Sequence, residues 1–159
     1  MAHQLCPVGL GFVETAPIRL VFGQEMTAAP EAVFRALAED VPGWSEWFSA
    51  VRSARPTADG REVRLRGGVR FEETVLKAKA PEVYTYRVDM TNVPGPRAWV
   101  EEWRLVPSGT GTRVRMTFAL DGTALFRAVS RLASPGMGRA FRTAVKTLDR
   151  RLSLQADRA

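Results

Sequence analysis

Two glutamates, Glu73 and Glu101, lie among apolar neighbours when side chains are assigned to alternating faces of the predicted strands. Glu73 follows Phe71 by two residues and Glu101 follows Trp99 by two, so each pair shares a face. A desolvated carboxyl group has a raised pKa and can act as a general acid or base. Two interpretations stay open. The carboxylates are polar anchors inside a cavity, or each reaches solvent near a sheet end or pairs with an arginine.

Tyrosines and other aromatic residues are the second chemical feature. Tyr84 and Tyr86 share one strand face, and each hydroxyl group needs a partner when it is buried. Tyr86 joins Glu73 and Glu101 as a candidate catalytic residue. The large side chains either line a site for a flat apolar ligand or simply fill the core. The candidate ligand-binding residues are Trp44, Trp47, Phe48, Phe71, Tyr84, Tyr86, Met90, Trp99, Trp103, Met116, Phe118, Met137 and Phe141.

Histidine and cysteine are too scarce for several other chemistries. His3 is the only histidine, which excludes a Ser-His-Asp triad and a histidine-rich metal site within the fold. Cys6 is the only cysteine, which excludes an intrachain disulfide and a cysteine-cluster metal site. We therefore expect no metal and no cofactor, and a reducing, cytoplasmic location.

The net charge of +6 is concentrated in the last segment. Residues 125–159 carry eight basic and two acidic residues, whereas residues 1–124 are balanced. Four of the cations form one helical stripe, at Arg139, Arg142, Lys146 and Arg150. No aromatic residues are interleaved with them, so a solvated helix face is favoured over contact with nucleic acid or an anionic membrane.

Hydrophobic stretches give no sign of membrane insertion or secretion. No run approaches the roughly 20 apolar residues that span a bilayer. The first 13 residues lack a basic region and contain Pro7 and two glycines, which argues against a secretory signal.

The period of the hydrophobic residues changes along the chain. Residues 18–26 alternate as a strand does, residues 30–40 recur at helical spacing, and residues 44–48 form a second short helical turn. Alternation then returns from Val51 onward. Six further strands are predicted at 51–57, 61–67, 69–79, 82–92, 97–107 and 112–120. Because short turns join them, we expect antiparallel pairing.

The last predicted element is a helix over residues 125–152. Its first apolar stripe consists of Leu125, Val129 and Leu132, and a second runs from Met137 to Leu152. Pro135 and Gly136 lie between the stripes, and a proline there is expected to kink or divide the helix.

These elements predict an α+β helix-grip fold, in which a seven-stranded curved antiparallel sheet, with two short helices, wraps around one long kinked C-terminal helix. The expected organisation is an N-terminal arm (1–16), one domain (17–152) and a C-terminal tail (153–159). One helix rarely fills the concave face of such a sheet, so a pocket is expected between them. We expect access to it near Pro135-Gly136 and the loop 92–96.

Several segments resemble the polyketide cyclase/dehydrase-type members of the START and birch-pollen-allergen-like (SRPBCC) superfamily. The similarity covers roughly residues 17–152. The matching segments are Ala29-Pro30-Glu31-Ala32-Val33-Phe34-Arg35-Ala36-Leu37-Ala38, Trp44-Ser45-Glu46-Trp47-Phe48, Val63 to Glu73, Tyr84 to Val88 and Gly111 to Val114. The resemblance implies the helix-grip fold. It does not assign a catalytic residue, because the superfamily includes carriers, receptors and cyclases.

Two functions follow as hypotheses. The first is the binding of a small hydrophobic ligand between the sheet and the long helix, and the alternative is a cofactor-independent polyketide cyclase or aromatase acting in the same cavity. The expected partner is a small hydrophobic or polyketide-like molecule, with no nucleic acid and no stable membrane insertion. A weak homodimer is compatible with this interpretation.

Overall fold

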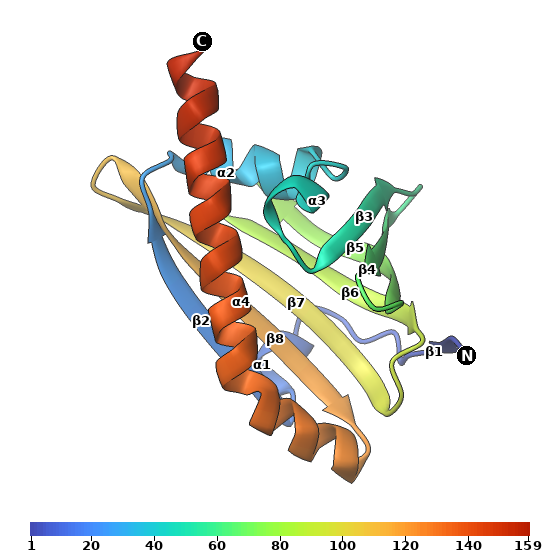
Figure 1. The fold of residues 1–159 in the computed structure, drawn as a ribbon. Helices are drawn as coiled ribbons and strands as arrows, with labels where there is room; N and C mark the ends of the chain where they lie inside the picture. The colour runs from blue at the N-terminus through green and yellow to red at the C-terminus, as the bar shows by residue number, and fades with distance from the viewer.

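The computed structural model describes residues 1–159 as a curved antiparallel sheet crossed by one long helix (Figure 1). The strands are β1 (His3–Gln4), β2 (Ile18–Met26), β3 (Val51–Pro56), β4 (Gly60–Leu65), β5 (Arg70–Lys79), β6 (Val83–Thr91), β7 (Pro96–Ser108) and β8 (Gly111–Gly122). The helices are α1 (Phe12–Thr15), α2 (Pro30–Phe34), the π-helical turn η1 (Arg35–Glu39), α3 (Trp44–Trp47) and α4 (Ala124–Asp157).

The sheet has the strand order β2-β8-β7-β6-β5-β4-β3, and every neighbouring pair is antiparallel. Strands β3 to β8 follow chain order because short turns join them. The α+β helix-grip fold with seven main strands is therefore confirmed. The two-residue strand β1 adds a short eighth strand, paired with β6.

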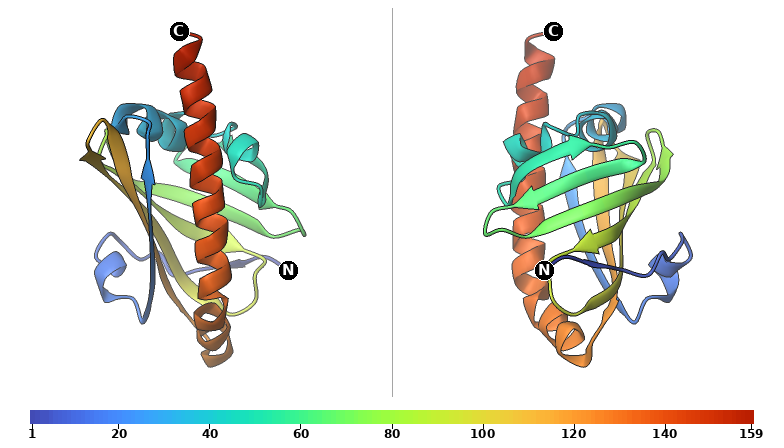
Figure 2. Two further views of the ribbon diagram at one scale, coloured as in Figure 1. Left: turned by 60° about the vertical axis from the view of Figure 1, so that its left-hand side comes forward. Right: turned by 90° about the vertical axis from the view of Figure 1, so that its right-hand side faces the viewer.

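Helix α4 lies across the concave face of the sheet and projects beyond it at the C-terminus (Figures 1 and 2). It bends in its N-terminal part, and it contains Pro135, which cannot donate a backbone hydrogen bond there. It continues to Asp157, so most of the expected tail is helical. The Asp149 carboxylate accepts hydrogen bonds from the backbone N–H groups of Thr27 and Ala28, which fixes α4 to the loop after β2.

The two apolar stripes of α4 have different environments. The second stripe is buried, with Phe141 and Leu148 each 1% exposed. The first stripe is in solvent, with Leu125, Val129 and Leu132 74%, 52% and 82% exposed. The start of α4 lies at the end of the sheet (Figure 1), so there is no concave face left for this stripe to cover. The four cations of the basic stripe are exposed as expected.

The N-terminal arm packs against the convex face of the sheet. Val13 of α1 forms a small apolar cluster with Val100 and Ala119, which lie on neighbouring strands β7 and β8. This cluster is separate from the main core between the sheet and α4. None of the helices combines the length and the hydrophobicity needed to cross a bilayer.

Candidate functional site

A cavity of about 220 Å³ lies between the concave face of the sheet, the α3–β3 segment and α4. Twelve of its fifteen lining residues are hydrophobic. The other three are charged: Arg61, Glu73 and Glu101. The structure therefore brings both predicted carboxylates to one apolar cavity, together with an arginine.

Nine of the predicted site residues line this cavity. They come from α3 and its C-terminal end, four strands and α4, and they are Trp44, Phe48, Phe71, Glu73, Tyr86, Glu101, Met116, Phe118 and Met137. The remaining lining residues were not predicted and are Ala50, Val51, Arg61, Val63, Leu65 and Ala140.

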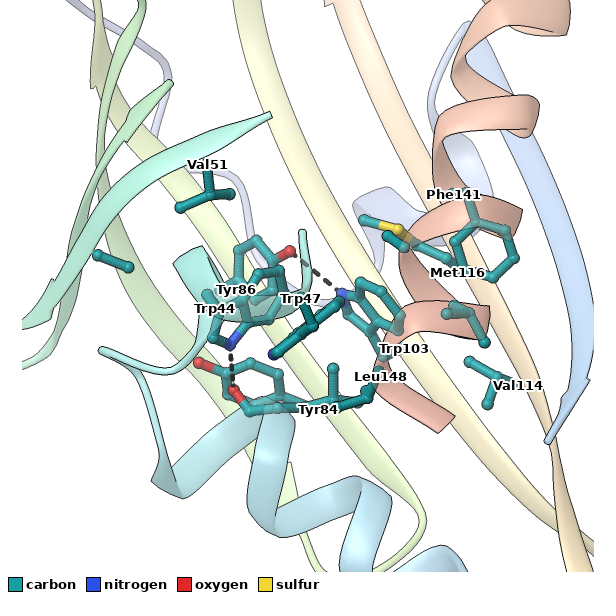
Figure 3. Close-up of a cluster of buried hydrophobic side chains, with 14 of the residues drawn as sticks. Trp44, Trp47, Val51, Tyr84, Tyr86, Trp103, Val114, Met116, Phe141 and Leu148 are labelled. Carbon is teal, nitrogen blue, oxygen red and sulfur yellow. Dashed lines mark hydrogen bonds between the residues drawn. The ribbon is translucent and has the colours of Figure 1, made fainter. Parts of the chain in front are cut away.

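Four of the predicted ligand-binding residues lie in the packed core next to the cavity instead of in its wall. They are Trp47, Tyr84, Trp103 and Phe141, all no more than 3% exposed. Figure 3 shows Trp44, Trp47, Tyr86 and Trp103 gathered beside α4. A fifth, Trp99, packs its ring against Phe71 and Phe126 and does not line the cavity. Aromatic content identified the interior correctly, but it could not separate cavity wall from filler.

Met90 lies on the other face of the sheet, contrary to the prediction. Strand β6 carries an irregularity between the pairs Glu72–Met90 and Glu73–Val88, so the residue between them, Asp89, is left over. An extra residue in one strand reverses the alternation beyond it. Met90 accordingly lines an outer groove that also includes Glu72, and the buried residue is Thr91.

Arg61 and Glu73 form a buried ion pair across β4 and β5. They are directly opposite in the strand register, and Arg61 Nε donates to Glu73 Oε2 at 2.5 Å. Their side chains are only 3% and 4% exposed. The neighbouring Gly60 permits the close approach of the two strands, because a β-carbon there would overlap the carbonyl oxygen of Glu73.

The guanidinium group of Arg61 lies between two aromatic rings. Its Cζ is 4.0 Å from the ring centroid of Trp44 and 4.2 Å from that of Tyr86. Both rings attract the cation through their π-faces. Within this sandwich Arg61 Nη1 is buried and has no hydrogen-bond partner, and it is the one buried side-chain nitrogen or oxygen in the protein in this condition.

Glu101 is held by two neutral donors. Tyr86 Oη donates to Glu101 Oε1 at 2.6 Å, and Trp99 Nε1 donates to Glu101 Oε2 at 2.7 Å. The tyrosine hydroxyl in turn accepts from Trp103 Nε1 at 3.2 Å (Figure 3). Two residues outside the cavity wall, Trp99 and Trp103, thus orient the polar groups inside it.

The environment shifts the pKa values of all three charged residues of the cavity, Arg61, Glu73 and Glu101, which we call the charged cluster. Desolvation raises the pKa of Glu73 to about 7, against the attraction of Arg61, and the nearby charge of Glu101 adds to the rise. Desolvation also raises the pKa of Glu101, although Tyr86 and Arg61 favour its ionised form. The pKa of Arg61 is raised because Glu73 and the tyrosines outweigh the effect of its burial, so it stays cationic. Glu73 therefore combines the two interpretations given for the carboxylates: it pairs with an arginine, and it lines the cavity.

Arg61 is the one charged residue of the cavity that was not predicted from the sequence. Its inward position could have been predicted, because alternation along β4 places Arg61 on the same face as Val63 and Leu65, which both line the cavity. Its pairing with Glu73 depends on the register between two strands, which alternation within one strand does not specify.

The half-buried and exposed lining residues mark where the cavity opens. Met137 and Ala140 of α4 lie on one side, directly after Pro135-Gly136, and Ala50 and Leu65 lie on the other. No residue of the loop 92–96 lines the cavity; Gly95 of this loop packs against Phe126 instead. No group of three or more His, Cys, Asp or Glu side chains is placed to hold a metal ion.

Comparisons with known proteins agree with this architecture. A family described as "Polyketide cyclase / dehydrase and lipid transport" matches residues 18–153. A search of curated proteins gave no match. Among solved structures, the protein TTHA0849 from Thermus thermophilus is 19% identical, with a TM-score of 0.67 over 87% of this chain and 99% of that one.

Two further solved structures are similar at lower identity. XoxI from Bacillus cereus is 14% identical, with a TM-score of 0.69 over 84% of this chain and 94% of that one. A START superfamily protein from Mycobacterium smegmatis is 10% identical, with a TM-score of 0.65 over 82% and 98%. At these identities the likeness shows a shared fold.

Proposed function

Because the chain belongs to the polyketide cyclase / dehydrase and lipid transport family, we propose that its cavity binds a small hydrophobic molecule. The observation that carries the proposal is an apolar space of about 220 Å³ whose wall includes residues of the main hydrophobic core. Protein interiors contain few voids larger than a water molecule, so an apolar space of this size is a candidate ligand site.

The size of the cavity limits the ligand. An engineered apolar cavity of about 150 Å³ holds benzene. A cavity of about 220 Å³ therefore suits a molecule of one or two rings. A long acyl or polyketide chain would not fit inside it completely.

A cavity-filling substitution tests whether the space is present in solution. Val63 is 4% exposed and lines the cavity, so the larger ring of Val63→Phe enters existing space. We expect it to lower the free energy of unfolding by less than about 1 kcal/mol. The matched control Val100→Phe enters the packed cluster on the convex face and should cost about 1–3 kcal/mol. Denaturant titration of both variants measures the difference.

The same variant tests ligand binding. Toluene, cumene and naphthalene should stabilise the wild type, by about 1.4 kcal/mol at ten times Kd. They should not stabilise Val63→Phe. Equal costs for the two phenylalanine variants, together with no stabilisation of the wild type by any of the three hydrocarbons, would refute the proposal.

A second candidate, a cyclase-like activity in the same cavity, is favoured by the state of Glu101. Its carboxyl group is half-buried, partial desolvation raises its pKa, and Tyr86 and Trp99 fix its orientation beside the apolar space. A general acid or base needs a positioned group with a pKa near the working pH. Glu101 would then assist enolisation of a bound ketone and the loss of water, with Glu73 as the second titrating group.

If this activity exists, Glu101→Gln should lower turnover of a small β-polyketone substrate by roughly 10²–10⁴-fold and change its affinity little. Glutamine keeps the shape and the hydrogen bonding of the side chain but removes the titrating proton. The control is Glu102→Gln, because Glu102 lies on the opposite face and binds Arg104. Steady-state kinetics of the three proteins measures both quantities, and equal turnover in all three would exclude Glu101 as the acid or base.

A further inference from the structure

The unpartnered Arg61 Nη1 requires a hydrogen-bond acceptor. A buried donor left without a partner costs about 1–3 kcal/mol, and more when it is charged. The ion pair does not remove this cost, because Glu73 accepts from Nε. Because Arg61 lines the apolar cavity, a ligand bound there can supply the missing partner.

The other polar groups of the cavity do not supply this partner. No oxygen of Glu73 or Glu101 makes a hydrogen bond with Nη1, and both oxygens of Glu101 accept from Tyr86 and Trp99 instead. The hydroxyl of Tyr86 donates to Glu101 and accepts from Trp103. The remaining lining residues are hydrophobic. A water molecule can serve in the empty cavity, but a purely apolar ligand that displaces it leaves the donor unpaired.

The charge of the cluster restricts the incoming group further. One cation, Arg61, faces two carboxylates, Glu73 and Glu101, so the ionised cluster already carries an excess negative charge in an apolar space. The raised pKa values of Glu73 and Glu101 have the same cause, since burial disfavours the negative charge. An anionic ligand would add a further buried negative charge, which is costly without a second cation.

From these observations we infer the class of ligand: an uncharged molecule of one or two rings with a carbonyl oxygen that accepts a hydrogen bond from Arg61 Nη1. The inference rests on the proposed binding function and specifies its polar contact. A carbonyl oxygen suits the site because it satisfies the donor without bringing a hydrogen that needs an acceptor of its own. Since Nη1 is buried, the oxygen reaches it only when the side chains that cover it move slightly.

Three probes of similar size test the inference: acetophenone with a carbonyl group, cumene without one, and benzoate with a charge. Each is titrated by calorimetry into the wild type and into the double variant Arg61→Met/Glu73→Gln. The double variant removes the donor and its partner together, so neither charge of the pair is left buried without the other. We compare the ratio of acetophenone affinity to cumene affinity between the two proteins. The hydration free energy of each free ligand is the same in both titrations, so it cancels in this comparison.

We expect this ratio to be at least tenfold higher in the wild type than in the double variant. We also expect benzoate to bind the wild type at pH 8 at least tenfold more weakly than acetophenone. A variant-independent readout is the ¹³C shift of carbonyl-labelled acetophenone, which should move on binding toward its value in hydrogen-bonding solvents.

The outcomes separate the inference from the binding function. If cumene and acetophenone bind but the ratio is the same in both proteins, or the ¹³C shift matches that in an alkane, the carbonyl contact is refuted and the binding function stands. If benzoate binds more tightly than acetophenone, the site is an anion receptor and the inference of an uncharged ligand is overturned. If none of the probes binds the wild type, the binding function itself fails.

Discussion

Arg61→Met should lower the free energy of unfolding by about 3–5 kcal/mol at pH 8. The substitution keeps an unbranched side chain between the rings of Trp44 and Tyr86 but leaves two carboxylates, Glu73 and Glu101, in an apolar cavity without a cation. A buried charge that loses its partner cannot recover its hydration, and this desolvation is the source of the loss. Urea titration at pH 8 measures it.

Two controls distinguish this effect from the loss of any arginine. Arg55 pairs with Glu62 on the surface, with 71% of its side chain exposed, so Arg55→Met should change stability by no more than about 0.5 kcal/mol. The double variant Arg61→Met/Glu73→Gln should recover most of the stability lost in Arg61→Met, because both partners become neutral. If Arg61→Met is as stable as Arg55→Met, the ion pair does not have the buried position described here.

The stability of the protein should fall as pH rises from about 4.5 to 7, through the ionisation of Glu73. Its pKa in the folded protein is about 7, whereas the ordinary value for glutamate is 4.5. Between these values the folded state keeps a proton that the unfolded chain has released. Stability therefore decreases with pH across this window and becomes constant above it. The shift corresponds to about 3 kcal/mol.

Denaturation of the wild type and of Glu73→Gln at intervals between pH 4.5 and 8 checks this prediction. The difference between the two curves isolates Glu73 from the surface carboxylates, and the wild type should lose stability relative to the variant as pH rises. The residual slope of Glu73→Gln should reflect Glu101, whose pKa is also raised. Parallel curves would show that folding leaves the pKa of Glu73 unchanged.

Both predictions concern the reason why charged residues, Arg61, Glu73 and Glu101, occupy an apolar cavity. Hydrophobic residues in place of Arg61 and Glu73 would fill the same space without a desolvation cost, so the ion pair is poor evidence of stabilisation. Polar groups that break the rules of core packing concentrate at functional sites. Arg61, Glu73 and Glu101 also line an apolar cavity, which is the arrangement expected of a ligand site.

The order and type of the main elements, and the face on which most side chains lie, could be predicted from the residues alone. Alternation placed Phe71, Glu73, Tyr86 and Glu101 toward the interior, and all four line the cavity. This succeeded because the direction of a side chain in a regular strand depends only on its position along that strand. The helical period of the second stripe in α4 identified its buried face for the same reason.

The packing of the elements against one another decided how deeply each side chain is buried, which partner it contacts and where the alternation along a strand breaks. Arg61 meets Glu73 because of the register between β4 and β5, and Met90 turns outward because β6 carries an extra residue against β5. The position of the sheet's end, and not the helical period, leaves Leu132 in solvent. Each of these outcomes depends on contacts between segments distant in sequence, whereas side-chain periodicity reports only the local geometry of one element.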